Sequence, residues 1–221
     1  MTRPDTTLVL VRHGVTDWNH ARRFQGQTDI ALNEEGLRQA ELTGRRLAAD
    51  PQRDRITAVY TSDLSRTAQT AAPIAAALGR AAQPEPGLRE RHYGSFEGLT
   101  HDELTHGAFA ADFRRWRARE PDFELPGGGE TLRAFDDRVG RTLASLAARH
   151  RGAVVVAVTH GGVLDCAYRI AAGVSLDAPR RHTLLNASLN WIVFDGERFR
   201  LNGWGDVAHL SEALDDIEAR D

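Results

Sequence analysis

Two short runs of consecutive apolar residues dominate the hydrophobic pattern of this chain. One covers residues 8–11 and the other residues 153–158, and both are rich in β-branched valine. Continuous apolar runs of this length, without the alternation of a half-exposed strand, predict strands buried on both faces of a parallel sheet. After one intervening residue, each run is followed by a histidine and a glycine, at His13-Gly14 and at His160-Gly161.

Three other segments have the spacing of amphipathic helices. We expect Asn33 to cap the first, Ser62 or Asp63 to cap the second after a strand at 56–60, and Thr131 to cap the third. The residues expected to face the core are Leu37, Ala40, Gly44, Leu47 and Ala48 in the first helix, Leu64, Ala68, Ala71, Ala75 and Leu78 in the second, and Leu132, Phe135, Val139, Leu143 and Leu146 in the third.

Strands that alternate with helices predict an α/β fold, a three-layer α/β/α sandwich with a mostly parallel central sheet. A length of 221 residues fits one domain over 1–221. Residues 99–121 predict one or two short helices, which we interpret as part of a helical cap insertion at about 99–128. Two apolar segments joined at Asp195-Gly196 predict a hairpin at the sheet edge, and its apolar surface around Trp191 could form a homodimer contact.

Composition narrows the function classes. A hydrophobic content of 41%, 27% charged residues and a net charge of −3 give no general attraction to nucleic acid or to an anionic membrane. All 28 basic residues are arginine, which excludes a Schiff-base lysine and a Walker-type phosphate loop. A single cysteine, Cys166, and a polar amino terminus predict a cytoplasmic protein, and we interpret Cys166 as a packing residue.

The residues after the two apolar runs carry the candidate chemistry. Arg12 and His13 form a basic pair at the end of a buried strand, which is costly unless an anion meets it. Ligands of parallel sheets bind outside the carboxyl ends of the strands, so His13 and His160 are expected to share one crevice. Arg66, in the first turn of the helix after residues 56–60, is expected near the same edge. Gly14 would let the backbone turn sharply beside a ligand.

Four sequence blocks resemble the histidine phosphatase (phosphoglycerate mutase-like) superfamily. They are residues 11–19 with Arg23-Phe24-Gln25-Gly26, residues 62–71, residues 90–94 and residues 159–162. The blocks follow the family's order and span roughly residues 8 to 165. Arg-His-Gly alone would be weak evidence, whereas four ordered blocks are specific.

The resemblance implies a division of labour among these residues. His13 is expected to attack phosphorus and form a phosphohistidine, and Glu90 to protonate the leaving oxygen as general acid. Arg12 and Arg66 offer planar forks matched to phosphate oxygens. Further hydrogen bonds to the transferring group are expected from His160 and Asn19, so that no metal or other cofactor is required.

Substrate contacts are expected from residues around this core, namely Gln25, Gly26, Tyr93, Arg114 and Arg115. The last two belong to a basic cluster around Trp116 that we interpret as a solvated helix face, with a rim attracting phosphorylated or carboxylated substrates as the functional alternative. His101 and His106 do not share a helix face as metal ligands would, and we expect both at the surface.

The resemblance favours a cofactor-independent phosphatase that releases inorganic phosphate from small phosphorylated metabolites. Only residues 99–128 are available to cover the crevice, whereas family mutases carry a longer insertion there. Phosphoglycerate mutase is the alternative, and Arg114 or Arg115 on a substrate carboxylate would favour it. A non-catalytic phosphate-binding module is a further alternative, although such proteins usually lose a catalytic histidine or the acid, and all five expected positions are occupied.

Overall fold

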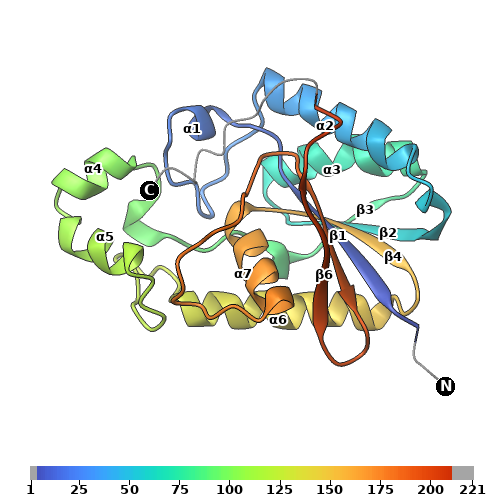
Figure 1. Ribbon diagram of the computed structural model, residues 1–221. Coiled ribbons are helices and arrows are strands. Elements are labelled where there is room, and N and C mark those ends of the chain that lie inside the picture. Colours follow the sequence, from blue (N-terminus) through green and yellow to red (C-terminus); the bar gives the residue numbers. More distant parts are fainter. Residues whose placement is uncertain (1–3, 211–221) are drawn as a thin grey trace.

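The computed structural model describes residues 4–210, which form a mixed six-stranded sheet with helices on both faces (Figure 1). The strand order is β3-β2-β4-β1-β5-β6. The first four strands in this order are parallel, whereas β5 is antiparallel to β1 and β6 to β5. The strands are β1 (Thr6–Arg12), β2 (Ile56–Thr61), β3 (Ala82–Pro84), β4 (Val154–Thr159), β5 (Leu189–Phe194) and β6 (Phe199–Asp206). The predicted fold class and edge hairpin are confirmed.

Seven α-helices accompany the sheet among the described residues. They are α1 (Asp17–His20), α2 (Glu34–Ala48), α3 (Ser65–Leu78), α4 (His101–His106), α5 (Ala110–Arg117), α6 (Leu132–Arg149) and α7 (Gly161–Ala172). In Figure 1, α2 and α3 lie on one face of the sheet and α6 and α7 on the other. None of these helices is long and apolar enough to cross a bilayer.

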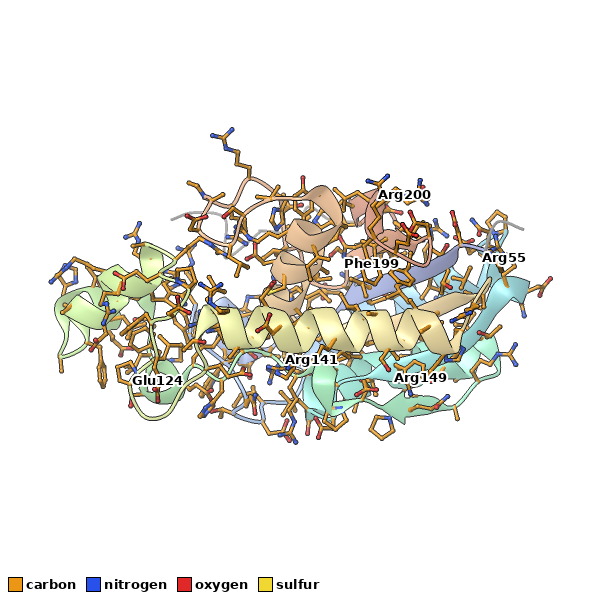
Figure 2. The ribbon with its side chains drawn as sticks, turned by 90° about the horizontal axis from the view of Figure 1, so that it is seen from below. Arg55, Glu124, Arg141, Arg149, Phe199 and Arg200 are labelled. Atoms are coloured by element: carbon orange, nitrogen blue, oxygen red, sulfur yellow. The ribbon has the colours of Figure 1, made fainter. Side chains whose placement is uncertain are left out.

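The continuous apolar runs of β1 and β4 serve two separate cores. Leu8 and Leu10 pack with α6 and α7, whereas Val9 and Val11 pack with α2 and α3. Successive side chains of a strand point to opposite faces of the sheet. A strand between two helical layers is therefore buried on both faces, and its apolar run is continuous. Figure 2 shows α6 crossing the sheet from the side of Glu124 to the side of Arg55.

Two of the three predicted helix caps are confirmed. The side chain of Asn33 accepts from Gly36 N at 2.9 Å, and that of Thr131 accepts from Ala134 N at 3.1 Å. The prediction that Ser62 or Asp63 caps α3 is wrong, because the cap position is Leu64 and makes no side-chain bond. Asp63 instead pairs with an arginine outside the helix.

The prediction that Leu37 faces the core is also wrong, since its exposed fraction is 46%. The buried residues of α2 include Ala40, Gly44 and Leu47. The difference arises at the first turn of the helix, where Gly36 rather than Leu37 faces inward against Val15.

Helices α4 and α5 lie away from the sheet (Figure 1). They pack on a third apolar cluster formed with Phe24 and Phe96. Thr100 begins α4 with a capping box, in which its side chain accepts from Glu103 N at 3.2 Å and the Glu103 carboxylate accepts from Thr100 N at 2.8 Å. The predicted pair of short helices is therefore present. Both helices reach the carboxyl edge of the sheet, where the candidate site lies.

The two-core arrangement predicts which leucines the fold needs. Leu143 of α6 is fully buried, so Leu143→Ala should lower the free energy of unfolding by about 2–5 kcal/mol through lost burial and a cavity. Leu37→Ala, the same change at a half-exposed position, should alter it by less than about 0.5 kcal/mol. Urea unfolding followed by circular dichroism measures both values. Equal losses in the two variants would contradict the assignment.

Candidate active site

A cavity of about 410 Å³ opens at the carboxyl edge of the parallel strands. Of the residues expected from the sequence, its lining includes Arg12, His13, Asn19, Gln25, Gly26, Arg66, Glu90 and Tyr93. His160 lies directly behind His13, with the two ring centroids 5.3 Å apart. Residues separated by up to 148 positions in the chain are therefore brought together in one place, as ligand sites of parallel sheets are.

His13 follows β1 directly and is held by the backbone on both sides. The backbone N–H of His13 donates to the carbonyl of Thr159 at 2.9 Å, and the side chain of Asn186 donates to the backbone carbonyl of His13 at 2.9 Å. Ring atom Nδ1 lies 2.7 Å from the carbonyl oxygen of Gly14. A carbonyl can only accept, so Nδ1 carries the proton and Nε2 keeps a lone pair in the neutral ring.

Burial lowers the pKa of His13 well below 6.5, and the positive charges of Arg66 and Arg12 lower it further. The ring is only 3% exposed. At neutral pH it is therefore a neutral imidazole, which is the nucleophilic form.

His160 stands at the N-terminus of α7 and is fully buried. Neither of its ring nitrogens has a hydrogen-bond partner among the described residues. Burial, followed by the charge of Arg66, lowers its pKa well below 6.5. A buried polar group left without a partner is costly, which is understandable where a ligand supplies the missing partner.

Two buried arginines border the histidines. Arg12 donates through Nη1 to the carbonyl of Leu184. Arg66 donates to the carbonyls of Gly26 at 2.7 Å and of Thr28 at 3.0 Å, while its Nε has no acceptor among the described residues. Burial lowers the pKa of Arg66 to about 10, so it is still a cation at neutral pH.

Glu90 is buried beside α7 rather than exposed on the surface. Its Oε1 accepts from Arg91 N at 2.8 Å and its Oε2 from Gly162 N at 2.9 Å. Both oxygens are therefore fixed by backbone N–H groups, which orients the carboxyl group. A Cβ atom on Gly162 would lie 2.2 Å from Glu90 Oε1, so the approach requires glycine at this position.

Asn19 enters the cavity from the short helix α1. Its Oδ1 accepts from the backbone and hydroxyl groups of Thr16, at 3.0 and 3.1 Å. Gln25 accepts from the same hydroxyl at 2.9 Å. The amide nitrogen of Asn19 has no acceptor in the described part of the chain, so it can donate to a ligand.

Arg114 and Arg115, which the sequence predicts as substrate contacts, lie outside this cavity. Neither residue lines it, and Arg115 instead lies over the ring of Phe123 and pairs with Glu120 at 2.8 Å. The next residues of α5, Trp116 and Arg117, do line the cavity. Each helical residue turns by about 100°, so neighbours in sequence face different directions.

The structure adds to two smaller expectations. His101 lines the cavity and stacks on Phe24 with ring centroids 5.0 Å apart, so it is not a simple surface histidine. Gly14 is needed for helix packing, and its expected role beside a ligand stays a prediction. A Cβ atom on Gly14 would lie 2.4 Å from the carbonyl oxygen of Gly36 in α2.

Some cavity residues carry no local signal in the sequence. Asp165 and Arg180 line the cavity, and Asn186 holds the His13 backbone from a loop 173 positions away. Contacts of this range depend on the closed fold and not on a motif. Within residues 4–210, no group of three or more histidine, cysteine, aspartate or glutamate side chains is arranged to hold a metal ion.

Neutral imidazoles among buried guanidinium groups suit a tetrahedral oxyanion, and this defines the class as phosphoryl-transfer enzymes on an α/β sheet. Residues 8–207 match the model of the histidine phosphatase superfamily, branch 1. The chain belongs to this superfamily. The family, the fold and the enzyme class predicted from the sequence are therefore confirmed.

Individual relatives agree with this assignment. An Arabidopsis thaliana protein named metal-independent phosphoserine phosphatase is 41% identical over 211 residues, with 93% of this chain and 84% of the relative covered. Phosphoglycerate mutase-like protein 4 of the same plant is 38% identical over 207 residues, with 93% and 87% covered. Among solved structures, Bacillus stearothermophilus YhfR has a TM-score of 0.81 at 34% identity, covering 92% of this chain and 98% of that chain.

The charge around His13 predicts its titration. Because burial, Arg66 and Arg12 all disfavour the imidazolium, the ring should titrate well below 6.5 in the free protein. Arg66→Gln removes one of the positive charges and should move the midpoint upward, only in part because burial remains. Arg114→Gln, outside the cavity, should leave it unchanged. NMR of the imidazole carbon signals measures the midpoint, and a value at or above 6.5 in the unmodified protein would contradict this account.

Proposed function

We propose that the chain is a metal-independent phosphomonoesterase that hydrolyses small phosphorylated metabolites through a phosphohistidine at His13. One observation carries the proposal. The Gly14 carbonyl fixes the proton on Nδ1 of a neutral, buried imidazole, which leaves the Nε2 lone pair beside Arg12 and Arg66. A nucleophile and the charges that neutralise its target thus occupy one cavity.

In the first step, Nε2 of His13 attacks phosphorus in line with the ester oxygen. The nitrogen–phosphorus bond forms as the bond to the leaving oxygen breaks, and Glu90 gives that oxygen a proton. Arg12, Arg66 and His160 donate to the other phosphoryl oxygens. The Nδ1 proton stays on the ring, where the Gly14 carbonyl stabilises the positive charge that the ring acquires.

In the second step, water enters where the leaving alcohol stood. Glu90, now a carboxylate, takes a proton from the water as its oxygen attacks phosphorus. The nitrogen–phosphorus bond breaks, inorganic phosphate is released, and His13 returns to the neutral imidazole. Arginine and imidazole donors supply the charge neutralisation that metal ions supply in other phosphatases.

The cavity supports a small-molecule substrate. Its volume of about 410 Å³ lies in the range of metabolite pockets, and aromatic side chains such as Trp116 and Tyr93 form part of its wall. We propose that residues 99–128 act as a cap, since α5 contributes Trp116 and Arg117 to that wall. A single domain over 1–221, a cytoplasmic location and a homodimer through the edge hairpin stay predictions.

Phosphoglycerate mutase is the second candidate, favoured by the relative named phosphoglycerate mutase-like protein 4. A mutase uses the same phosphohistidine but returns the phosphoryl group to an alcohol. Arg114 and Arg115 would have favoured this reading as contacts to a substrate carboxylate, and both lie outside the cavity. The non-catalytic alternative has no support from a site in which the nucleophile, the acid and the phosphate-binding groups are all present.

The phosphatase and mutase readings predict different products. With 3-phosphoglycerate as substrate, we expect release of inorganic phosphate, and no faster formation of 2-phosphoglycerate when 2,3-bisphosphoglycerate is added. Phosphorus NMR follows both products in one sample, with and without a chelator. A rapid equilibrium between the two phosphoglycerates would establish the mutase instead, and loss of activity with the chelator would contradict the metal-independent mechanism.

The roles of His13 and Glu90 can be separated by the leaving group. His13→Ala should reduce turnover of every phosphomonoester by about a thousandfold or more. It should also abolish the acid-labile phosphoryl label that the substrate leaves on the protein. Glu90→Gln should lower kcat/KM, which reports the first step, by about 10²–10⁴-fold for alkyl phosphates but far less for 4-nitrophenyl phosphate, because nitrophenolate leaves without a proton. Arg114→Gln serves as the control with unchanged rates. An equal loss of kcat/KM on alkyl phosphates and on 4-nitrophenyl phosphate in Glu90→Gln would contradict the role of Glu90 as general acid.

A further inference from the structure

Asp165 is a charged residue in the cavity that the two-step reaction does not use. It lies on α7, is only 7% exposed, and has three basic side chains around its carboxylate. Arg119 Nη2 lies 2.8 Å and Arg169 Nε 3.0 Å from Oδ2, and His182 Nε2 lies 3.1 Å from Oδ1. Burial alone would raise the pKa of Asp165, but these neighbours hold it below its usual value, so it is a carboxylate at neutral pH.

The two arginines extend this cluster to the loop after α7. Arg169 donates from Nη1 to the carbonyl of Ser175 at 2.6 Å, and Arg119 donates from Nε to the carbonyl of Leu176 at 2.6 Å. Asp165 therefore fixes two consecutive carbonyls through its arginines. The same loop brings Arg180 to the cavity wall, and its far end supplies the Leu184 carbonyl to Arg12.

The charge balance shows which ligand this end of the cavity suits. Among the described residues, eight arginines line the cavity against two acids, Glu90 and Asp165. The Asp165 carboxylate is paired with two arginines, so this cluster carries no net negative charge that would attract an ammonium group. Arg119, in contrast, uses only Nε and Nη2, and its Nη1 donors have no acceptor among the described residues.

We propose that Arg119 and Arg180 form a second anion subsite, held in place by Asp165, which selects phosphomonoesters whose leaving group bears a carboxylate or a second phosphate. This inference rests on the proposed phosphomonoesterase activity. Arg119 and Arg180 are binding residues in this account, and Asp165 is a positioning residue that acts through Arg119. The planar guanidinium fork matches either kind of anion.

The subsite lies on the side of the general acid. Gly162 donates to the Glu90 carboxylate, and Asp165 follows three residues later on the same helix. Three residues correspond to roughly 4.5 Å along the helix axis. Asp165, which holds Arg119, is therefore near the acid that protonates the leaving oxygen, so the subsite would meet the leaving group.

Matched substrate pairs test the subsite. 3-Phosphoglycerate and glycerol 3-phosphate differ only in a carboxylate against a hydroxymethyl group, and propane-1,3-diol bisphosphate and its monophosphate differ only in the second phosphate. We expect kcat/KM to be about tenfold or more higher, in at least one pair, for the member whose leaving group carries the additional anion, mainly through KM, since hydrogen bonds between charged groups are strong. The pair that shows the preference identifies the anion. Ratios near one in both pairs would overturn the proposal.

Three variants locate the preference, with Arg114→Gln as the control outside the cavity. Arg119→Gln should reduce the kcat/KM ratio of the preferred substrate pair to near one. Arg180→Gln should have the same effect, and it tests the subsite from the loop if the first variant does not fold. Asp165→Asn should also lower the ratio, although it makes the cavity more positive. A higher ratio in Asp165→Asn would show that charge alone attracts the anion and would overturn the positioning role.

The two proposals fail in different ways. If the chain is not a phosphomonoesterase, none of the four compounds and no 4-nitrophenyl phosphate is hydrolysed. If only the subsite is wrong, the compounds are hydrolysed with ratios that do not respond to Arg119→Gln and Arg180→Gln.

Discussion

The site depends on two buried guanidinium groups, Arg12 and Arg66, that donate hydrogen bonds to backbone carbonyls beside the two histidines. Arg66 is held by backbone carbonyls rather than by an acid, and Arg12 is held in part by the carbonyl of Leu184. A buried cation without a full counter-charge is unfavourable, and its field also disfavours any nearby proton. Burial and this field together keep His13 and His160 neutral. An incoming phosphate therefore relieves a cost that the folded protein already carries.

The rest of the fold supplies the free energy that makes this arrangement tolerable. Two apolar cores, one on each face of the sheet, meet at β1 and β4. β1 ends in Arg12 and leads into His13, and β4 leads into His160, so the most strongly buried hydrophobic segments lead directly into the least favourable polar ones. Functional sites commonly contain such local conflicts, which the surrounding structure offsets.

The sequence was sufficient for the main strands and helices and for the gathering of the candidate site residues at one edge of the sheet, because these follow from local patterns. Valine runs predict buried strands, and Asn33 and Thr131 predict helix starts from their own side chains. The differences between expectation and structure have another origin. Leu37 and the pair Arg114 and Arg115 fit the helical spacing, but only the packed structure decides which side of a helix is covered. Asp165 and Asn186 act through partners far along the chain, so no window of sequence could identify them.

The pairing of β1 with β4 has a consequence for how this site tolerates change. Arg12 is in register with Thr159, so the two histidines follow directly on neighbouring strands. Adjacent strands are about 4.8 Å apart, close to the 5.3 Å between the imidazole centroids. The spacing of the reactive pair is thus a property of the backbone ladder at the centre of the sheet. Insertions or deletions in the surrounding loops can reshape the chamber for another metabolite without altering that spacing.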